Sequence, residues 1–101
     1  MTASEAWFLY LVRTARNTLY TGITTDPQRR LEEHAGSKRG ARALRGKGPL
    51  ELAFVHGPIA RSRAARLEGA VKALDRRAKE DVVAGRLHPD SLLASEDGEI
   101  V

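Results

Sequence analysis

Two apolar runs, separated by a short polar segment and followed directly by a helix start, constrain the fold of this chain more than any other feature. Residues 7–13 read Trp-Phe-Leu-Tyr-Leu-Val-Arg, an aromatic and aliphatic run that predicts a strand covered on both faces. Asn17, which tolerates a positive φ, lies in the polar segment, and residues 19–24 predict a returning antiparallel strand. Asp26 and Pro27 then supply an N-cap and a first helical residue.

The register of this hairpin decides whether its two tyrosines, Tyr10 and Tyr20, can act together. Side chains alternate across a strand, and residues paired between neighbouring strands share a face. Both tyrosines carry even numbers, so they share a face only if the residue numbers of paired positions add up to an even number. The two tyrosines can therefore share a face only if the connecting loop has an odd number of residues centred near Asn17, or if the hairpin contains a bulge. A two-residue turn at Arg16-Asn17 would put the tyrosines on opposite faces.

One further strand and a base-rich segment are predicted after the first helix. That helix should run to about Ala35 and end near Gly36, where glycine favours a helix end. Residues 37–49 are rich in glycine and predict a loop, with one helical turn over residues 41–44. Residues 50–55 predict a third short strand that ends at Gly57-Pro58.

A helical period takes over from residue 59. The helical region is expected to break into two helices near Asp75-Arg76 and to end at Gly85. Ser62 is predicted to be the N-cap of the first of these helices. Residues 91–94 predict one more helical turn after the stop at His88-Pro89. The apolar residues of the stripe recur at spacings of four and three: Ala60, Ala64, Leu67, Val71, Leu74, Ala78 and Val82.

Length and composition predict a single small domain. The 101 residues are 42% hydrophobic and 30% charged, which is ordinary for a globular protein. We expect one domain over 1–101, with a core at about 7–85 and an acidic tail at about 90–101. No run approaches the roughly 18–20 apolar residues of a membrane span, and the N-terminus lacks a signal-peptide pattern. With no cysteine in the chain, these features favour a cytoplasmic protein.

The distribution of charge favours a polyanionic partner. The net charge of +4 combines +8 over residues 1–89 with −4 over residues 90–101. Neutralising phosphates releases condensed counterions, so a basic body suits nucleic acid, although a basic surface can also serve solubility alone. We expect the base-rich loop to grip the nucleic-acid backbone through five residues: Lys38, Arg39, Arg42, Arg45 and Lys47.

Arg30 and His34 are the first candidates for chemistry. They stand at i and i+4 of the first helix and so share one of its faces. Arg30 could hold a phosphate oxygen in a bidentate fork, and His34 could relay a proton or orient a tyrosine hydroxyl. The alternative is a solvated basic face, which fits Arg29 better than Arg30 because Arg29 has Glu33 at i+4.

Tyr10, Tyr20 and Glu68 complete the candidate set. A phenol with a pKa near 10 is a poor base at neutral pH, so it needs activation, and two core aromatics are the alternative. Glu68 lies at the border between the apolar stripe and solvent, where one carboxylate with waters and phosphates could hold magnesium. The alternative for Glu68 is a surface pair with Lys72 at i+4. His56 and His88 have no neighbour at ligand spacing, which disfavours a zinc site.

In order and spacing these residues resemble the signature of the GIY-YIG endonuclease superfamily, and the whole chain resembles its small stand-alone bacterial YhbQ-like branch. The resemblance covers roughly residues 7–85. It rests on Phe8-Leu9-Tyr10, Tyr20-Thr21-Gly22, Arg30, His34 and Glu68. It departs from the pattern in the first motif, which keeps only its tyrosine. The asparagine that many relatives carry after the metal glutamate is also missing, because residues 79–81 read Lys-Glu-Asp.

The resemblance implies an α/β (α+β) fold in which a three-stranded antiparallel sheet is flanked by helices. It maps the catalytic residues to Tyr10, Tyr20, Arg30 and His34 and the metal ligand to Glu68, with Mg²⁺ or Mn²⁺ as the cofactor. Tyr10 is the preferred base for activating water with Tyr20 assisting, and the reverse assignment stays open.

Three functional hypotheses follow. The first is a metal-dependent endonuclease that hydrolyses DNA, branched or single-stranded, with selection by structure rather than by sequence. The second is a non-catalytic nucleic-acid-binding module on the same scaffold. The third is an adaptor domain that acts through a partner protein.

Overall fold

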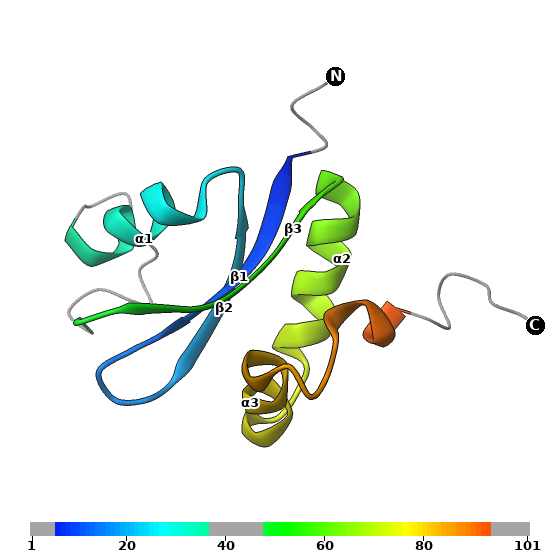
Figure 1. Cartoon of the computed structure of the whole chain (residues 1–101). Coiled ribbons are helices and arrows are strands. Elements are labelled where there is room, and N and C mark those ends of the chain that lie inside the picture. The colour runs from blue at the N-terminus through cyan, green and yellow to red at the C-terminus, as the bar shows by residue number, and fades with distance from the viewer. Residues whose placement is uncertain (1–5, 37–47, 94–101) are drawn as a thin grey trace, which may run out of the picture.

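The computed structural model describes residues 6–36 and 48–93, which form a three-stranded antiparallel sheet flanked by helices (Figure 1). The strands are β1 (Trp7–Arg13), β2 (Leu19–Thr24) and β3 (Glu51–Ile59), in the spatial order β2-β1-β3. The helices are α1 (Pro27–Gly36), α2 (Arg61–Lys72), α3 (Arg76–Ala84) and a 3-10 helix (Pro89–Leu93). The predicted fold class is confirmed. Neither the five basic residues of the loop nor the predicted turn at 41–44 lies within the described residues.

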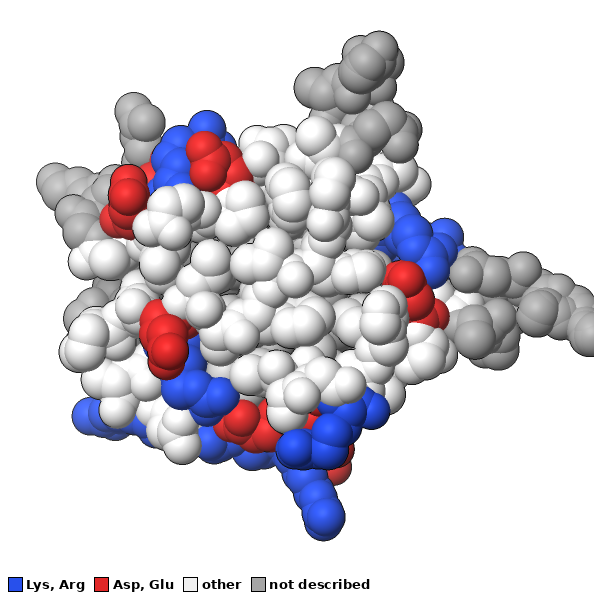
Figure 2. All heavy atoms as spheres, in the orientation of Figure 1, with Lys and Arg blue, Asp and Glu red and all other residues white. Residues whose placement is uncertain are grey.

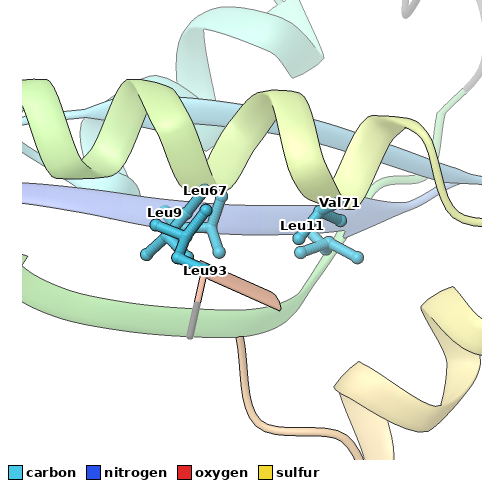
Figure 3. Packing of buried hydrophobic residues seen from close by; sticks show 5 residues of the cluster. All are labelled: Leu9, Leu11, Leu67, Val71 and Leu93. Atoms are coloured by element: carbon cyan, nitrogen blue, oxygen red, sulfur yellow. The ribbon is translucent and has the colours of Figure 1, made fainter. Parts of the chain in front are cut away.

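The central strand β1 separates two apolar clusters because its side chains alternate between the faces of the sheet. Leu9 and Leu11 pack with Leu67 and Val71 of α2, and Leu93 of the 3-10 helix closes this cluster (Figure 3). On the other face, Tyr10 and Val12 pack with Leu31 of α1 and with side chains of β2 and β3. One face of the sheet is therefore an aliphatic core, and the other carries a buried tyrosine.

The hairpin has the register that brings the two tyrosines to one face. Tyr10 pairs with Gly22 and Val12 pairs with Tyr20, so the residue numbers of paired positions add up to an even number. The loop spans residues 14–18, an odd number, and Asn17 has a φ of 68°. Both features were predicted from the sequence, and both are confirmed.

Strand β3 is longer than predicted. The expectation that it ends at Gly57-Pro58 is wrong, because the strand continues to Ile59. A bulge makes this possible: Trp7 pairs with Ile59 whereas Leu9 pairs with His56, so β3 contains one residue more than β1 over this stretch. Because β3 lies at the edge of the sheet, a proline can be accommodated in it.

The structure confirms the helix starts and ends that were predicted from the sequence, with one exception. Asp26 accepts a hydrogen bond from Arg29 N at 3.1 Å, and Asp75 caps α3 by accepting one from Ala78 N at 2.8 Å. The break at Asp75-Arg76 is confirmed, and Gly85 ends α3 with a φ of 84°.

Ser62 is the exception, because the N-cap of α2 is Ala60 and no side chain caps this helix. The longer β3 shifts the helix start, which leaves Ser62 inside the first turn. Within the described residues, no helix is long and apolar enough to cross a membrane.

A polar network joins the hairpin loop to α3. Arg13 donates to both carboxylate oxygens of Glu80, at 2.8 and 2.9 Å, and also to Asn17 Oδ1 at 2.8 Å. Arg76 donates to the same carboxylate at 3.3 Å and to the backbone oxygen of Asn17. The guanidinium of Arg13, with a smaller contribution from that of Arg76, lowers the pKa of Glu80 to about 2. Residues 67 positions apart in the sequence are thus linked by a bidentate ion pair.

We predict that Glu80→Gln destabilises the fold at neutral pH and that the effect disappears in acid. The ion pair is partly exposed, so the loss should be about 0.5–1 kcal/mol, or about 2–8 °C in Tm for a domain of this size. Because the pKa of Glu80 is depressed in the folded state, its contribution is present above pH ~4.5 and is lost as pH falls towards 2. Thermal unfolding of both proteins across this range measures the difference.

The matched control is Glu32→Gln, which removes the same charge from an exposed position on α1. It should leave the difference in Tm near zero at every pH. An unchanged gap for Glu80→Gln at pH 2 would show that the ion pair is not its source.

Candidate active site

Tyr10 is the centre of the candidate site. Its side chain is only 2% exposed, and its hydroxyl lies 2.8 Å from Nε2 of His34 on α1. Arg30, one helical turn before His34, also hydrogen-bonds the Tyr10 hydroxyl. A guanidinium is a donor only, so the Tyr10 oxygen accepts from Arg30. In the bond between Tyr10 and His34 either group can donate, depending on the imidazole tautomer.

Gly22 explains how Tyr10 reaches this position. Tyr10 pairs with Gly22 across the β1–β2 ladder, and its ring lies over that glycine. A Cβ built at Gly22 would come within 2.6 Å of Tyr10 Oη and 2.7 Å of Cζ. The missing side chain therefore leaves the space through which the phenol crosses β2 towards the edge of the sheet.

Tyr20 stands beside Tyr10 and His34. Its ring centroid is 6.4 Å from that of Tyr10 and 5.4 Å from that of His34, the latter in an edge-on arrangement. These are distances at which aromatic rings attract each other, and they pack the three rings into one cluster. Tyr20 is half-buried, whereas His34 is only 4% exposed.

The electrostatics of the cluster favour neutral forms of both Tyr10 and His34. Burial, assisted by the proximity of Tyr20 and Glu68, raises the pKa of Tyr10 to about 12 although Arg30 opposes the shift. Burial and then the charge of Arg30 lower the pKa of His34 below its ordinary value. At neutral pH the site thus holds a protonated phenol 2.8 Å from a ring nitrogen of a neutral imidazole.

Glu33 was not singled out as a site residue, yet it binds Arg30. The separation is 2.8 Å for Arg30 and 3.7 Å for Arg29, so the Arg29–Glu33 pair considered as the alternative is present, and Arg30 makes a second, closer pair with the same carboxylate. Residues three apart are also neighbours on a helix, which the sequence reasoning overlooked. Glu33 orients the guanidinium that reaches Tyr10.

Glu68 lies close enough to Tyr10 to raise its pKa, although it comes from α2. Its side chain is 25% exposed and lies 3.3 Å from Lys72 Nζ, so the surface pair considered above is present too. Among the described residues, no three His, Cys, Asp or Glu side chains form a group that could hold a metal ion. The donor set fits an ion held by one carboxylate, waters and substrate phosphates, which suits Mg²⁺ better than a metal that needs a full protein cage.

His56 and His88 lie outside this cluster but next to each other. Their ring centroids are 5.3 Å apart, and Asp90 lies near both, at 3.4 Å from His56 and 3.8 Å from His88. They are 32 positions apart in the chain, so their spacing in the sequence does not reveal this proximity. Arg63 already contacts the same carboxylate at 3.2 Å.

The chain is similar to known proteins in both sequence and fold. Residues 6–81 match the GIY-YIG catalytic domain family. A UPF0213 protein of Klebsiella pneumoniae subsp. pneumoniae is 58% identical over 88 residues, which cover 87% of this chain and 82% of that protein. The UPF0213 protein YhbQ of Escherichia coli O1:K1 is 53% identical over 95 residues, covering 93% and 94%. The names of these relatives state no activity.

A solved structure is also similar. The solution NMR structure of a UPF0213 protein from Bacillus halodurans has a TM-score of 0.52 and 35% identity, and the match covers 88% of this chain and 94% of that one. This likeness supports the three-stranded sheet and the flanking helices described above.

We predict that Gly22→Ala displaces the Tyr10 ring and breaks its contact with His34. The ring is rigid and buried, so overpacking should cost about 1–3 kcal/mol in the free energy of unfolding. Denaturant unfolding and the NMR shifts of the His34 ring report the two effects. The matched control is Gly69→Ala, because a Cβ at this exposed position of α2 meets no atom within 4 Å.

Gly69→Ala should stabilise the protein by about 0.5–1 kcal/mol through helix propensity. If Gly22→Ala were equally harmless, the close approach of the phenol to β2 would be wrong.

Proposed function

The chain belongs to the GIY-YIG catalytic domain family, and from this membership we propose that it is an endonuclease that hydrolyses DNA phosphodiester bonds with one divalent metal ion. The observation that carries the proposal is the 2.8 Å contact between the Tyr10 hydroxyl and His34 Nε2, with Arg30 on the same phenol oxygen. These are the groups that activating a water and stabilising a charged transition state require.

Tyr10 and His34 act as a proton relay in this proposal. A phenol with a pKa of about 12 is a weak acid, so it does not serve as a base by ionising at neutral pH. Instead, the Tyr10 oxygen takes a proton from the attacking water while its own proton passes to His34 Nε2. The lowered pKa of His34 keeps its imidazole ready to accept this proton. Tyr20 assists by packing against both rings.

Arg30 supplies positive charge next to the relay. Glu33 fixes its guanidinium at 2.8 Å, and the hydrogen bond to Tyr10 places the charge beside the reacting water. There it stabilises the negative charge that builds up on the phosphate oxygens in the transition state.

Glu68, with waters and substrate oxygens, would hold Mg²⁺ or Mn²⁺. Such an ion supplies Lewis-acid stabilisation of the phosphate when it is bound.

A second candidate is a nucleic-acid-binding module without turnover. The pairing of Glu68 with Lys72 favours it, because a carboxylate already engaged by a cation is less available to a metal ion. In this case Lys72 would have to move before the site could be loaded. The two candidates differ in cleavage but share a phosphate-binding surface.

The test is cleavage of a panel of DNA forks, junctions, flaps and single strands, with RNA alongside, in Mg²⁺ or Mn²⁺. We predict that Tyr10→Phe lowers kcat/KM by about 10²–10⁴, the range for a positioned proton-transfer group. Glu68→Ala should abolish the metal-dependent cleavage. Glu32→Ala, at an exposed position on the same helix as His34, is the control and should cleave as the wild type does.

The pH profile separates the relay from a tyrosinate base. Cleavage should fall only when His34 becomes protonated, below the usual histidine pKa of about 6.5. It should stay level through pH 9–10, because Tyr10 titrates near 12. A rate that rises through pH 10 would contradict the relay. Metal-independent binding with no cleavage of any substrate would favour the module.

A further inference from the structure

The hairpin loop and α3 form one rigid surface at the end of the sheet. The bidentate contact of Arg13 with Glu80 and the bond from Arg76 to the backbone of Asn17 hold the loop against the helix. Residues 14–18 and the first turns of α3 are thus fixed relative to each other. We call this the hairpin–α3 surface, made of residues 13–18 and 75–80.

This surface carries an excess of positive charge. It contains five cations and two acids, and both acids are engaged: Glu80 is shared by two guanidinium groups, and Asp75 caps α3. Arg16 and Arg77 are exposed, and no acid among the described residues pairs with either. Figure 2 shows Lys and Arg along the lower edge of the molecule, with Asp and Glu between them, where Figure 1 places the hairpin and α3, whereas the centre of this view is largely uncharged.

The hairpin end of this surface is joined to the candidate active site through β2, whereas α3 packs on the aliphatic face of the sheet. Arg16 is four residues from Tyr20, so the backbone between them spans no more than about 14 Å. A nucleic-acid strand bound at the Tyr10–His34 centre and running along β2 would reach the hairpin within a few phosphates. The loop and α3 contain no aromatic residue, so they offer no platform for stacking bases.

We propose that the hairpin–α3 surface binds the phosphate backbone of the nucleic-acid strand that flanks the cleaved bond, with Arg16 and Arg77 as its main contacts. The inference rests on the proposed function and adds a second phosphate site to it. Guanidinium groups suit this role because their fork binds phosphate oxygens in pairs. Binding here is independent of base sequence, because every contact is made to the backbone.

The test measures the salt dependence of binding, in EDTA, to a fluorescent single-stranded DNA of random sequence. Each phosphate contact contributes about 0.7 to the slope of log K against log salt for single strands. The double variant Arg16→Ala/Arg77→Ala should therefore lower the slope by about 1.4 and weaken binding at low salt. Arg61→Ala is the control, because Arg61 is an exposed arginine that lies against Trp7 instead. It should leave the slope unchanged.

The outcomes separate this inference from the proposed function because binding is measured without metal and cleavage is assayed apart. A lowered slope for the double variant supports the surface even if the wild type cleaves nothing. An unchanged slope overturns the surface even if the wild type is an active nuclease. An equal loss in Arg61→Ala would show an effect of bulk charge and would also overturn it, as would a wild type that binds no DNA at low salt. Circular dichroism of each variant verifies that the fold is intact.

Discussion

The pairing register of β1 and β2, which puts Tyr10 and Tyr20 on one face of the sheet, is the constraint on which the rest of the site depends. It pairs Tyr10 with Gly22, so the phenol meets a residue with no side chain and can cross β2. The same register puts Tyr20 on the face of Tyr10 and leaves Leu9 and Leu11 to the aliphatic core on the other side. A shift by one residue would put Tyr20 on the face opposite to Tyr10, beneath α2. Fold and chemistry are therefore fixed by one loop length.

Burial raises the pKa of the Tyr10 phenol and the charge of Arg30 lowers it, and burial has the larger effect. Arg30 alone would favour the ionised form of Tyr10, yet the pKa of this group is raised to about 12. The same burial lowers the pKa of His34. A neutral imidazole and a firmly held phenol proton thus face each other in a nearly dry contact. This is a suitable starting state for a concerted transfer, and it is less suitable for a free tyrosinate.

Features with local causes could be predicted from the sequence, whereas features with long-range causes could not. The first two strands and the Asp26 cap depend on neighbouring residues. Because Tyr10 and Tyr20 both have even numbers, a shared face required a loop with an odd number of residues or a bulge. The end of β3 depends on a bulge against β1, which no local pattern reveals. The ion pair between Arg13 and Glu80 joins residues 67 positions apart, so only the folded chain brings them together. The candidate residues on β1, β2 and α1 converge as expected, but their catalytic roles still rest on the family.

The most direct test of the relay is the protonation state of His34, read from ¹⁵N NMR of the imidazole ring. At neutral pH we expect a single neutral tautomer with its proton on Nδ1 and with Nε2 accepting from Tyr10, and a pKa below about 6.5. In Tyr10→Phe the Nε2 signal should move away from that of a hydrogen-bonded acceptor. A proton on Nε2 at neutral pH, or a His34 titration identical in both proteins, would contradict the account.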